Sequence, residues 1–202
     1  MKLYGVVNSP FVRMCLVTAH EVGLKNKLNF VRTSVSPIEV NPALARLSPI
    51  GKIPVLETDH AHALYDSRVI MEYLAHVAGS RSFIPDDGVK RFRVLTLLAL
   101  ANGIAEAAVA LRYEQAARPE GTRWPELVDR QKARITDGMD EIETHWIDML
   151  GHVSAGSVAL ACAVGYIDYR HGDLDWRNQR PQAALHLDAF AKRESMLSCP
   201  VG

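Results

Sequence analysis

The stretch Ser9-Pro10-Phe11-Val12-Arg13 decides how the chain begins to fold. It follows an apolar run of strand type, Leu3 to Val7, and it opens a helical pattern that continues through Leu16 and Val17. Proline is favoured at the first position of a helix, and serine is a common N-cap because its hydroxyl accepts a free backbone N–H. We therefore predict a strand-to-helix junction with the Ser9 hydroxyl at a helix N-terminus, where an anion such as a thiolate is stabilised. A serine that only caps the helix is the alternative for this stretch alone.

A second stretch, Gly51-Lys52-Ile53-Pro54-Val55, leads into the short apolar run Val55 to Glu57. Proline cannot donate to a sheet ladder, so it belongs at a strand start or at an edge. With a cis bond before Pro54, the backbone groups of Ile53 would point outward and pair with an extended peptide ligand by β-strand addition. An ordinary trans proline in a loop is the alternative.

A third stretch, Asp66-Ser67-Arg68, begins a helix whose apolar residues share one face: Val69, Ile70, Tyr73 and Leu74. The free N–H groups and the hydroxyl at this helix N-terminus suit a carboxylate, and the acidic side chain beside them suits an ammonium group. An α-amino acid end carries both groups. The alternative is a plain N-cap.

The pattern of elements changes near residue 80. Before it, helical segments around 11–23 and 66–78 alternate with short strands at Leu3 to Val7, Leu28 to Val31, Val55 to Glu57 and Ala61 to Leu64. After it, the sequence is helical throughout. We predict an α/β domain over 1–78, a linker over 79–88 that is rich in turn-forming residues, and an all-helical domain over 89–202.

Within the second domain, apolar spacing predicts a long helix through Val94 to Ala108 and another through Ile135 to Met149. The segment Ser157 to Ile167 is apolar on nearly every side, which predicts a central helix wrapped by the others.

Composition narrows the class of protein. Lys plus Arg equals Asp plus Glu at 23 each, so there is no electrostatic sign of a nucleic-acid partner. Cys15, Cys162 and Cys199 are widely spaced and the histidines are scattered, so we expect no disulfide framework and no metal. The apolar start of the chain is too short for a signal peptide, and no stretch approaches the roughly 18 apolar residues of a membrane span. We expect a cytoplasmic protein without a membrane partner.

The three stretches, in their order and spacing, resemble the cytosolic glutathione transferases of the thioredoxin-fold superfamily. The Ser9 to Arg13 stretch, together with Cys162-Ala163-Val164-Gly165-Tyr166 and Asp168-Tyr169-Arg170, resembles the bacterial YibF-type subgroup. The resemblance covers nearly the whole chain. It implies a thioredoxin-like domain followed by a helical bundle domain, a homodimer, and glutathione as co-substrate. It also implies a capping box at the start of the central helix, a serine followed three residues later by an aspartate; the matching positions are Ser154 and Ser157, so we expect this box to lack its carboxylate and to be incomplete.

The resemblance also implies roles for single residues. Ser9 matches the position that faces the glutathione sulfur. Ile53, just before the cis-proline position Pro54, would pair its backbone with the cysteinyl unit. Asp66 and Ser67 match the pair that holds the γ-glutamyl end, where Asp66 replaces the usual glutamate and shortens the reach by one methylene.

Two further parts of the site follow from the resemblance. Lys52 resembles a basic residue near the glycyl carboxylate, although a solvated surface lysine is an equal alternative. The second substrate would occupy a cleft between the domains, with Phe11 on the glutathione side. The other wall would be the long helix carrying Asn102, Ala105, Glu106, Val109 and Tyr113. Simple interdomain packing is the alternative for these residues.

The resemblance implies a glutathione transferase active in detoxification. A free thiol has a pKa of about 8.5, and a helix N-terminus with a hydroxyl donor lowers it, so that a thiolate attacks a small, hydrophobic electrophile. Serine instead of cysteine at position 9 argues against thiol–disulfide reductase chemistry. Conjugation, peroxide reduction, dehalogenation and isomerisation stay open. The alternative is a non-catalytic protein-interaction or regulatory module with the same fold, although the presence of Pro54 and the γ-glutamyl pair favours the enzyme.

Overall fold

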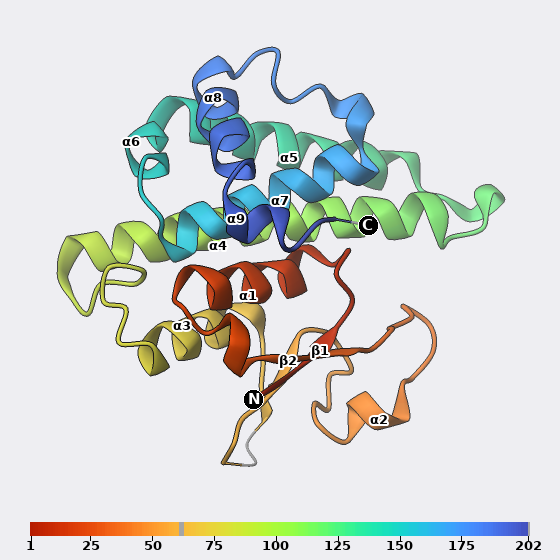
Figure 1. The fold of residues 1–202 in the computed structure, drawn as a ribbon. Coiled ribbons are helices and arrows are strands. Elements are labelled where there is room, and N and C mark those ends of the chain that lie inside the picture. The colour runs from red at the N-terminus through yellow and green to blue at the C-terminus, as the bar shows by residue number, and fades with distance from the viewer. Residues whose placement is uncertain (61–62, 202) are drawn as a thin grey trace.

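The computed structural model describes residues 1–60 and 63–201, and the first part of this range forms a four-stranded mixed sheet (Figure 1). The strand order is β2-β1-β3-β4. Strand β1 pairs in parallel with β2 and antiparallel with β3, which pairs antiparallel with β4. The bounds are β1 (Lys2–Gly5), β2 (Asn29–Arg32), β3 (Val55–Glu57) and β4 (Ala63–Leu64). Residues 61 and 62 of the fourth predicted strand lie outside the described residues.

Two helices connect the sheet to the rest of the molecule. Helix α1 (Pro10–Glu21) and helix α3 (Ser67–Val77) pack side by side, and α1 also packs on α7 (Ala155–Arg170) of the second domain. Figure 1 shows α1 between the strands and the helical domain. The short helix α2 (Pro42–Ala45) lies in the connection from β2 to β3. The N-terminus of α1 is therefore held between the two domains.

The second domain is helical, as predicted. Its helices are α4 (Gly88–Ala116), α5 (Pro125–His145), α6 (Ile147–Leu150), α7, α8 (Pro181–Ala191) and α9 (Glu194–Leu197), with 3-10 turns at Glu120–Thr122 and Gly172–Leu174; a further 3-10 turn, Lys25–Lys27, lies between α1 and β2 in the first domain. Every residue from Ala155 to Val164 is buried, and α7 contacts α1, α4 and α8. The prediction of a wrapped central helix is confirmed.

The predicted helix through Met149 is wrong at its end. Helix α5 stops at His145, because Trp146 takes φ −123° and ψ 4°, and the chain continues as the separate short helix α6. The apolar spacing is preserved across this break, which is why the sequence pattern did not reveal it. The Trp146 indole donates to the Glu141 carboxylate at 3.1 Å.

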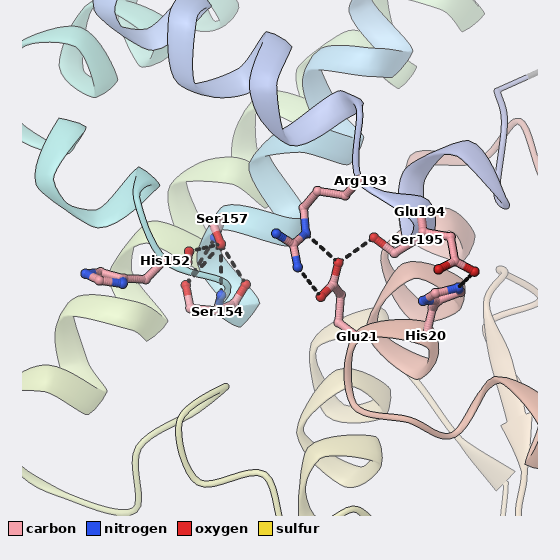
Figure 2. Close-up of polar contacts among 8 residues, drawn as sticks. All are labelled: His20, Glu21, His152, Ser154, Ser157, Arg193, Glu194 and Ser195. Atoms are coloured by element: carbon pink, nitrogen blue, oxygen red, sulfur yellow. Dashed lines mark hydrogen bonds and ion pairs between the residues drawn. The ribbon is translucent and has the colours of Figure 1, made fainter.

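The start of α7 also differs from expectation, because its capping box is complete. The Ser157 hydroxyl accepts a hydrogen bond from the Ser154 N–H at 2.9 Å, and the Ser154 hydroxyl accepts one from the Ser157 N–H at 3.3 Å. Figure 2 shows this pair beside His152, whose carbonyl accepts from the Ser157 hydroxyl at 2.8 Å. A hydroxyl oxygen serves here in place of the carboxylate that we considered necessary.

The expectation that no stretch of the chain is long and apolar enough to span a membrane is wrong for helix α4. Its length and composition meet the criteria for a membrane-crossing helix. However, 56% of its most apolar window is buried inside this fold, where α4 packs on α5 and α7. This burial accounts for its apolar composition.

The end of the chain returns to α1 and fixes it against the second domain. The Arg193 guanidinium binds the Glu21 carboxylate through Nε at 2.8 Å and Nη2 at 2.9 Å, and the Ser195 hydroxyl donates to the same carboxylate (Figure 2). From α1, Arg13 Nε donates to the Cys199 carbonyl at 2.7 Å. Helix α1, which carries the candidate site at its N-terminus, is thus anchored to the C-terminal segment by the Arg193–Glu21 ion pair and by hydrogen bonds to neutral groups of that segment.

Candidate functional site

A cavity of about 700 Å³ opens at the N-terminus of α1, between the two domains. Ser9 and Phe11 line it from the β1–α1 junction, and Gly51, Lys52 and Ile53 line it from the loop before β3. The helical domain contributes residues from α4 and α7. The first two sequence stretches therefore meet at one cavity.

Ser9 is the N-cap of α1, with Pro10 at the first helical position, as predicted from the sequence. Its hydroxyl accepts from the Val12 N–H at 3.4 Å, which is at the long end for a hydrogen bond. Within the described part of the chain, no hydrogen bond is donated by this hydroxyl. Its proton is therefore available to a ligand in the cavity, next to the positive end of the helix dipole.

The loop before β3 provides an exposed cation and a backbone edge. Lys52 is exposed at the cavity rim, and Ile53 is half-buried in the lining. The Ile53–Pro54 peptide bond is cis. Pro54 itself is buried and does not line the cavity.

Asp66 and Ser67 stand at the N-terminus of α3 and do not line the cavity directly. The Asp66 carboxylate accepts the Arg68 N–H at 3.0 Å and binds the Arg68 guanidinium at 2.9 Å. Partial burial alone would raise the pKa of Asp66, but the hydrogen bonds and charge of Arg68 lower it below its ordinary value. Ser67 is almost fully buried, and its carbonyl faces the Cys15 thiol at 3.9 Å.

Glu106 lies in the cavity lining and also influences the N-terminus of α3 through its charge. It lines the cavity from α4, and its charge acts on Arg68, whose pKa is raised first by the hydrogen bond to Asp66. The carboxylate of Glu106 therefore contributes to the electrostatic environment of both the cavity and the N-terminus of α3.

Only some of the α4 residues that were predicted to line the cavity do so. Glu106, Val109 and Tyr113 line the cavity, whereas Asn102 and Ala105 do not. Asn102 is buried and its amide donates to the Leu98 carbonyl at 3.1 Å, and Ala105 is fully buried in the core. These two residues belong to the part of α4 that is packed inside the domain, which spacing along one helix does not separate from the cavity face.

Four lining residues of the helical domain were not predicted: Ala110 and Arg112 of α4, and Tyr166 and Arg170 of α7. Arg112 directly precedes the predicted Tyr113. Tyr166 and Arg170 lie inside the two runs of α7 that carried the resemblance, so a signal was present there. Burial raises the pKa of Tyr166, while the charges of Arg170 and Arg112 act in the opposite direction.

The two parts of the chain match family models described as "Glutathione S-transferase, N-terminal domain" over residues 8–77 and "Glutathione S-transferase, C-terminal domain" over residues 125–189. A GST-like protein of Escherichia coli, YibF, described as uncharacterized, is 31% identical over 198 residues, which are 96% of each chain. The chain therefore belongs to the glutathione transferase family.

Two solved structures of relatives extend this comparison. A glutathione transferase family member from Pseudomonas fluorescens Pf-5, with bound glutathione, is 39% identical and matches with a TM-score of 0.97, covering 100% of this chain and 98% of its own. A glutathione S-transferase from Methylobacillus flagellatus KT, with glutathione bound, is 32% identical with a TM-score of 0.84, covering 98% of each chain.

Proposed function

We propose that this protein binds glutathione in the cavity at the N-terminus of α1 and transfers it, as the thiolate, to a small electrophile. The observation that carries this proposal is the position of the Ser9 hydroxyl, which faces the cavity at a helix N-terminus with its proton unused by the described residues. The relatives with bound glutathione, at 39% and 32% identity, support glutathione as the thiol.

The proposed binding mode uses the N-termini of helices α1 and α3. The Ser9 hydroxyl donates to the sulfur, the backbone of Ile53 pairs with the cysteinyl unit, and Lys52 attracts the glycyl carboxylate. Asp66 and Ser67 hold the γ-glutamyl end. Phe11 forms the boundary between this part of the cavity and the space for the second substrate.

The state of Asp66 fits its proposed role. Its lowered pKa keeps the carboxylate ionised at neutral pH, as binding of an ammonium group requires. The carboxylate is already paired with Arg68 on an exposed edge, so the ammonium group of glutathione joins an existing ion pair. The ligand carboxylate then meets the Arg68 guanidinium and the free N–H groups of α3.

The proposed chemistry is nucleophilic attack by sulfur. The helix N-terminus and the Ser9 hydrogen bond favour the thiolate over the thiol, which lowers the pKa of the bound thiol. Sulfur forms a bond to the electrophilic carbon, and a leaving group departs with its electron pair. Ser9 acts as a donor and not as a covalent nucleophile, because no described residue is hydrogen-bonded to it as a general base.

Calorimetric titration with glutathione tests the proposal. We expect the wild type to bind, and Asp66→Asn to bind at least about tenfold more weakly, because hydrogen bonds to charged groups contribute about 1.5–3 kcal/mol. Asp87→Asn is the matched control, since Asp87 is also a helix N-cap but makes no side-chain cap hydrogen bond. Absence of glutathione binding by the folded wild type would refute the enzyme and favour the protein-interaction module.

We also propose that the protein is a homodimer that acts in the cytoplasm in detoxification. Large apolar side chains are exposed on α3 and at the start of α4: Val69, Val77, Val89 and Phe92, of which Phe92 is 68% exposed. Light scattering should give twice the monomer mass for the wild type and a lower mass for Phe92→Glu. The free thiols Cys15, Cys162 and Cys199 fit a reducing compartment.

A further inference from the structure

Two arginine side chains from different helices line the same cavity. Arg112 lies on α4 and Arg170 ends α7, and both are half-buried. Neither forms an ion pair within residues 1–60 and 63–201. Many other arginines in this part of the chain are paired with carboxylates, among them Arg68, Arg91, Arg93, Arg177 and Arg193. The cavity therefore contains two partly desolvated cations that are not ion-paired with any described carboxylate.

The Arg170 guanidinium is held in place by Tyr169 and interacts with the Tyr166 hydroxyl, but one of its nitrogens has no partner. Its guanidinium carbon lies 4.1 Å from the centroid of the Tyr169 ring, and this stacking fixes the plane of the group. Its Nε is buried and has no hydrogen-bond partner among the described residues. A buried donor without a partner is costly, and the guanidinium fork matches the two oxygens of a carboxylate.

The positive charges of Arg112 and Arg170 both influence the pKa values of Tyr166 and His171. The charges of both reach the Tyr166 hydroxyl, which burial keeps neutral, and both also reach His171, whose ring nitrogen lies 2.8 Å from the Ala108 carbonyl. Burial lowers the pKa of His171, so the imidazole is neutral and adds no competing charge at neutral pH. Asp173 is the acid that acts on His171 from the following turn, and it forms no ion pair with either arginine among the described residues.

Glutathione does not use these two cations in the proposed binding mode. Its two carboxylates are assigned to Lys52 and to the N-terminus of α3, and its ammonium group to Asp66. The acid that lines the cavity is Glu106, which is exposed and acts on Arg68. Arg112 and Arg170 are thus left for the second substrate, and a neutral hydrophobic molecule would bury both without compensation.

We propose that the second substrate is an electrophile that carries a carboxylate, held by Arg112 and Arg170; this inference rests on the proposed glutathione transferase function. The carboxylate end is anchored on the helical domain, and the electrophilic carbon points toward the sulfur at Ser9. With a halogenated aromatic acid, sulfur forms the new C–S bond, the C–Cl bond breaks, and chloride leaves with the electron pair. This substitution requires no oxidant or reductant.

A matched pair of substrates tests this inference. The anion is a chlorodinitrobenzoate with chlorine para to the carboxylate, and the neutral partner is the corresponding amide. The first measurement is calorimetric binding of the two glutathione S-conjugates, which requires no turnover. The second is the enzymatic rate with each chloride, corrected for the rate without enzyme. The proteins are the wild type, Arg112→Gln, Arg170→Gln and the charge-matched control Arg130→Gln, an exposed α5 residue outside the cavity.

We expect the wild type to bind the acidic conjugate at least about tenfold more tightly than the amide conjugate. Arg112→Gln and Arg170→Gln should each lose most of this preference, while their affinity for glutathione and their thermal midpoint stay close to those of Arg130→Gln. Equal binding of the two conjugates by a wild type that binds glutathione would overturn the inference and leave the proposed function intact. Loss of glutathione affinity in the arginine variants would also overturn it, because the cations would then belong to the glutathione site. A wild type that binds no glutathione would remove the basis of both.

Discussion

Replacement of Ser9 by alanine separates the two roles that this residue can have. The hydroxyl contributes to the helix as an N-cap, and in the proposed function it also donates to the sulfur of glutathione. The cap hydrogen bond from the Val12 N–H is long, at 3.4 Å. Loss of a serine cap typically costs about 1 kcal/mol, so we expect Ser9→Ala to lower the free energy of unfolding by no more than that.

Ser154→Ala is the matched control for the cap. Ser154 also caps a helix, at the start of α7, and its hydroxyl accepts from the Ser157 N–H at 3.3 Å while remaining almost fully buried. We expect this variant to lose as much stability as Ser9→Ala or more. It lies outside the cavity lining, so the properties of bound glutathione should not change.

The pKa of the bound glutathione thiol in Ser9→Ala decides whether Ser9 has a role beyond capping. A hydrogen bond to a charged group contributes about 1.5–3 kcal/mol, and 1.36 kcal/mol corresponds to one pH unit in a pKa. Removal of the Ser9 donor should therefore raise the pKa of bound glutathione by about 1–2 pH units, with the N-terminus of α1 still providing part of the stabilisation. The ultraviolet absorbance of the thiolate, followed against pH at saturating glutathione, measures this shift. An unchanged thiol pKa in a Ser9→Ala variant that still binds glutathione would show that Ser9 is only a cap.

Two further predictions concern the scaffold that holds the site. Glu21→Gln should lower stability by about 2 kcal/mol at neutral pH, because Arg193 loses its charged partner, though Arg193 is partly solvated. Burial would raise the pKa of Glu21, but its hydrogen bonds to Arg193 and Ser195 lower it. The stability difference between the wild type and Glu21→Gln should therefore be fully present above about pH 5 and should decrease as the pH falls through the lowered pKa. Denaturant unfolding at several pH values measures this difference. Gly156→Ala should cost about 1–3 kcal/mol in thermal unfolding, because its Cβ would lie 2.8 Å from Leu97; an unchanged midpoint would contradict this packing of α7 on α4.

The sequence predicts best the parts of the site that are built locally. Ser9 and Pro10 specify the start of α1 through capping chemistry that acts within four residues, and Asp66 does the same for α3. The central helix α7 is recognisable because it is apolar on all sides. In each case the signal and the structure that it specifies occupy the same short segment.

The parts that sequence reasoning missed depend on contacts between distant segments. The position of Asn102 in the core and of Arg112 in the cavity is decided by how α4 rotates against α7, which spacing along α4 alone does not determine. The tail that anchors α1 through Arg193 has no periodic pattern that points to Glu21. The break at Trp146 leaves the apolar spacing intact and changes only the backbone.

A crystal structure of the protein with glutathione tests the central claim most directly. We predict electron density for glutathione in the cavity at the N-terminus of α1, with its sulfur within hydrogen-bond distance of the Ser9 hydroxyl and its γ-glutamyl end at Asp66 and Ser67. Glutathione bound elsewhere, or bound here with its sulfur directed away from Ser9, would contradict the account.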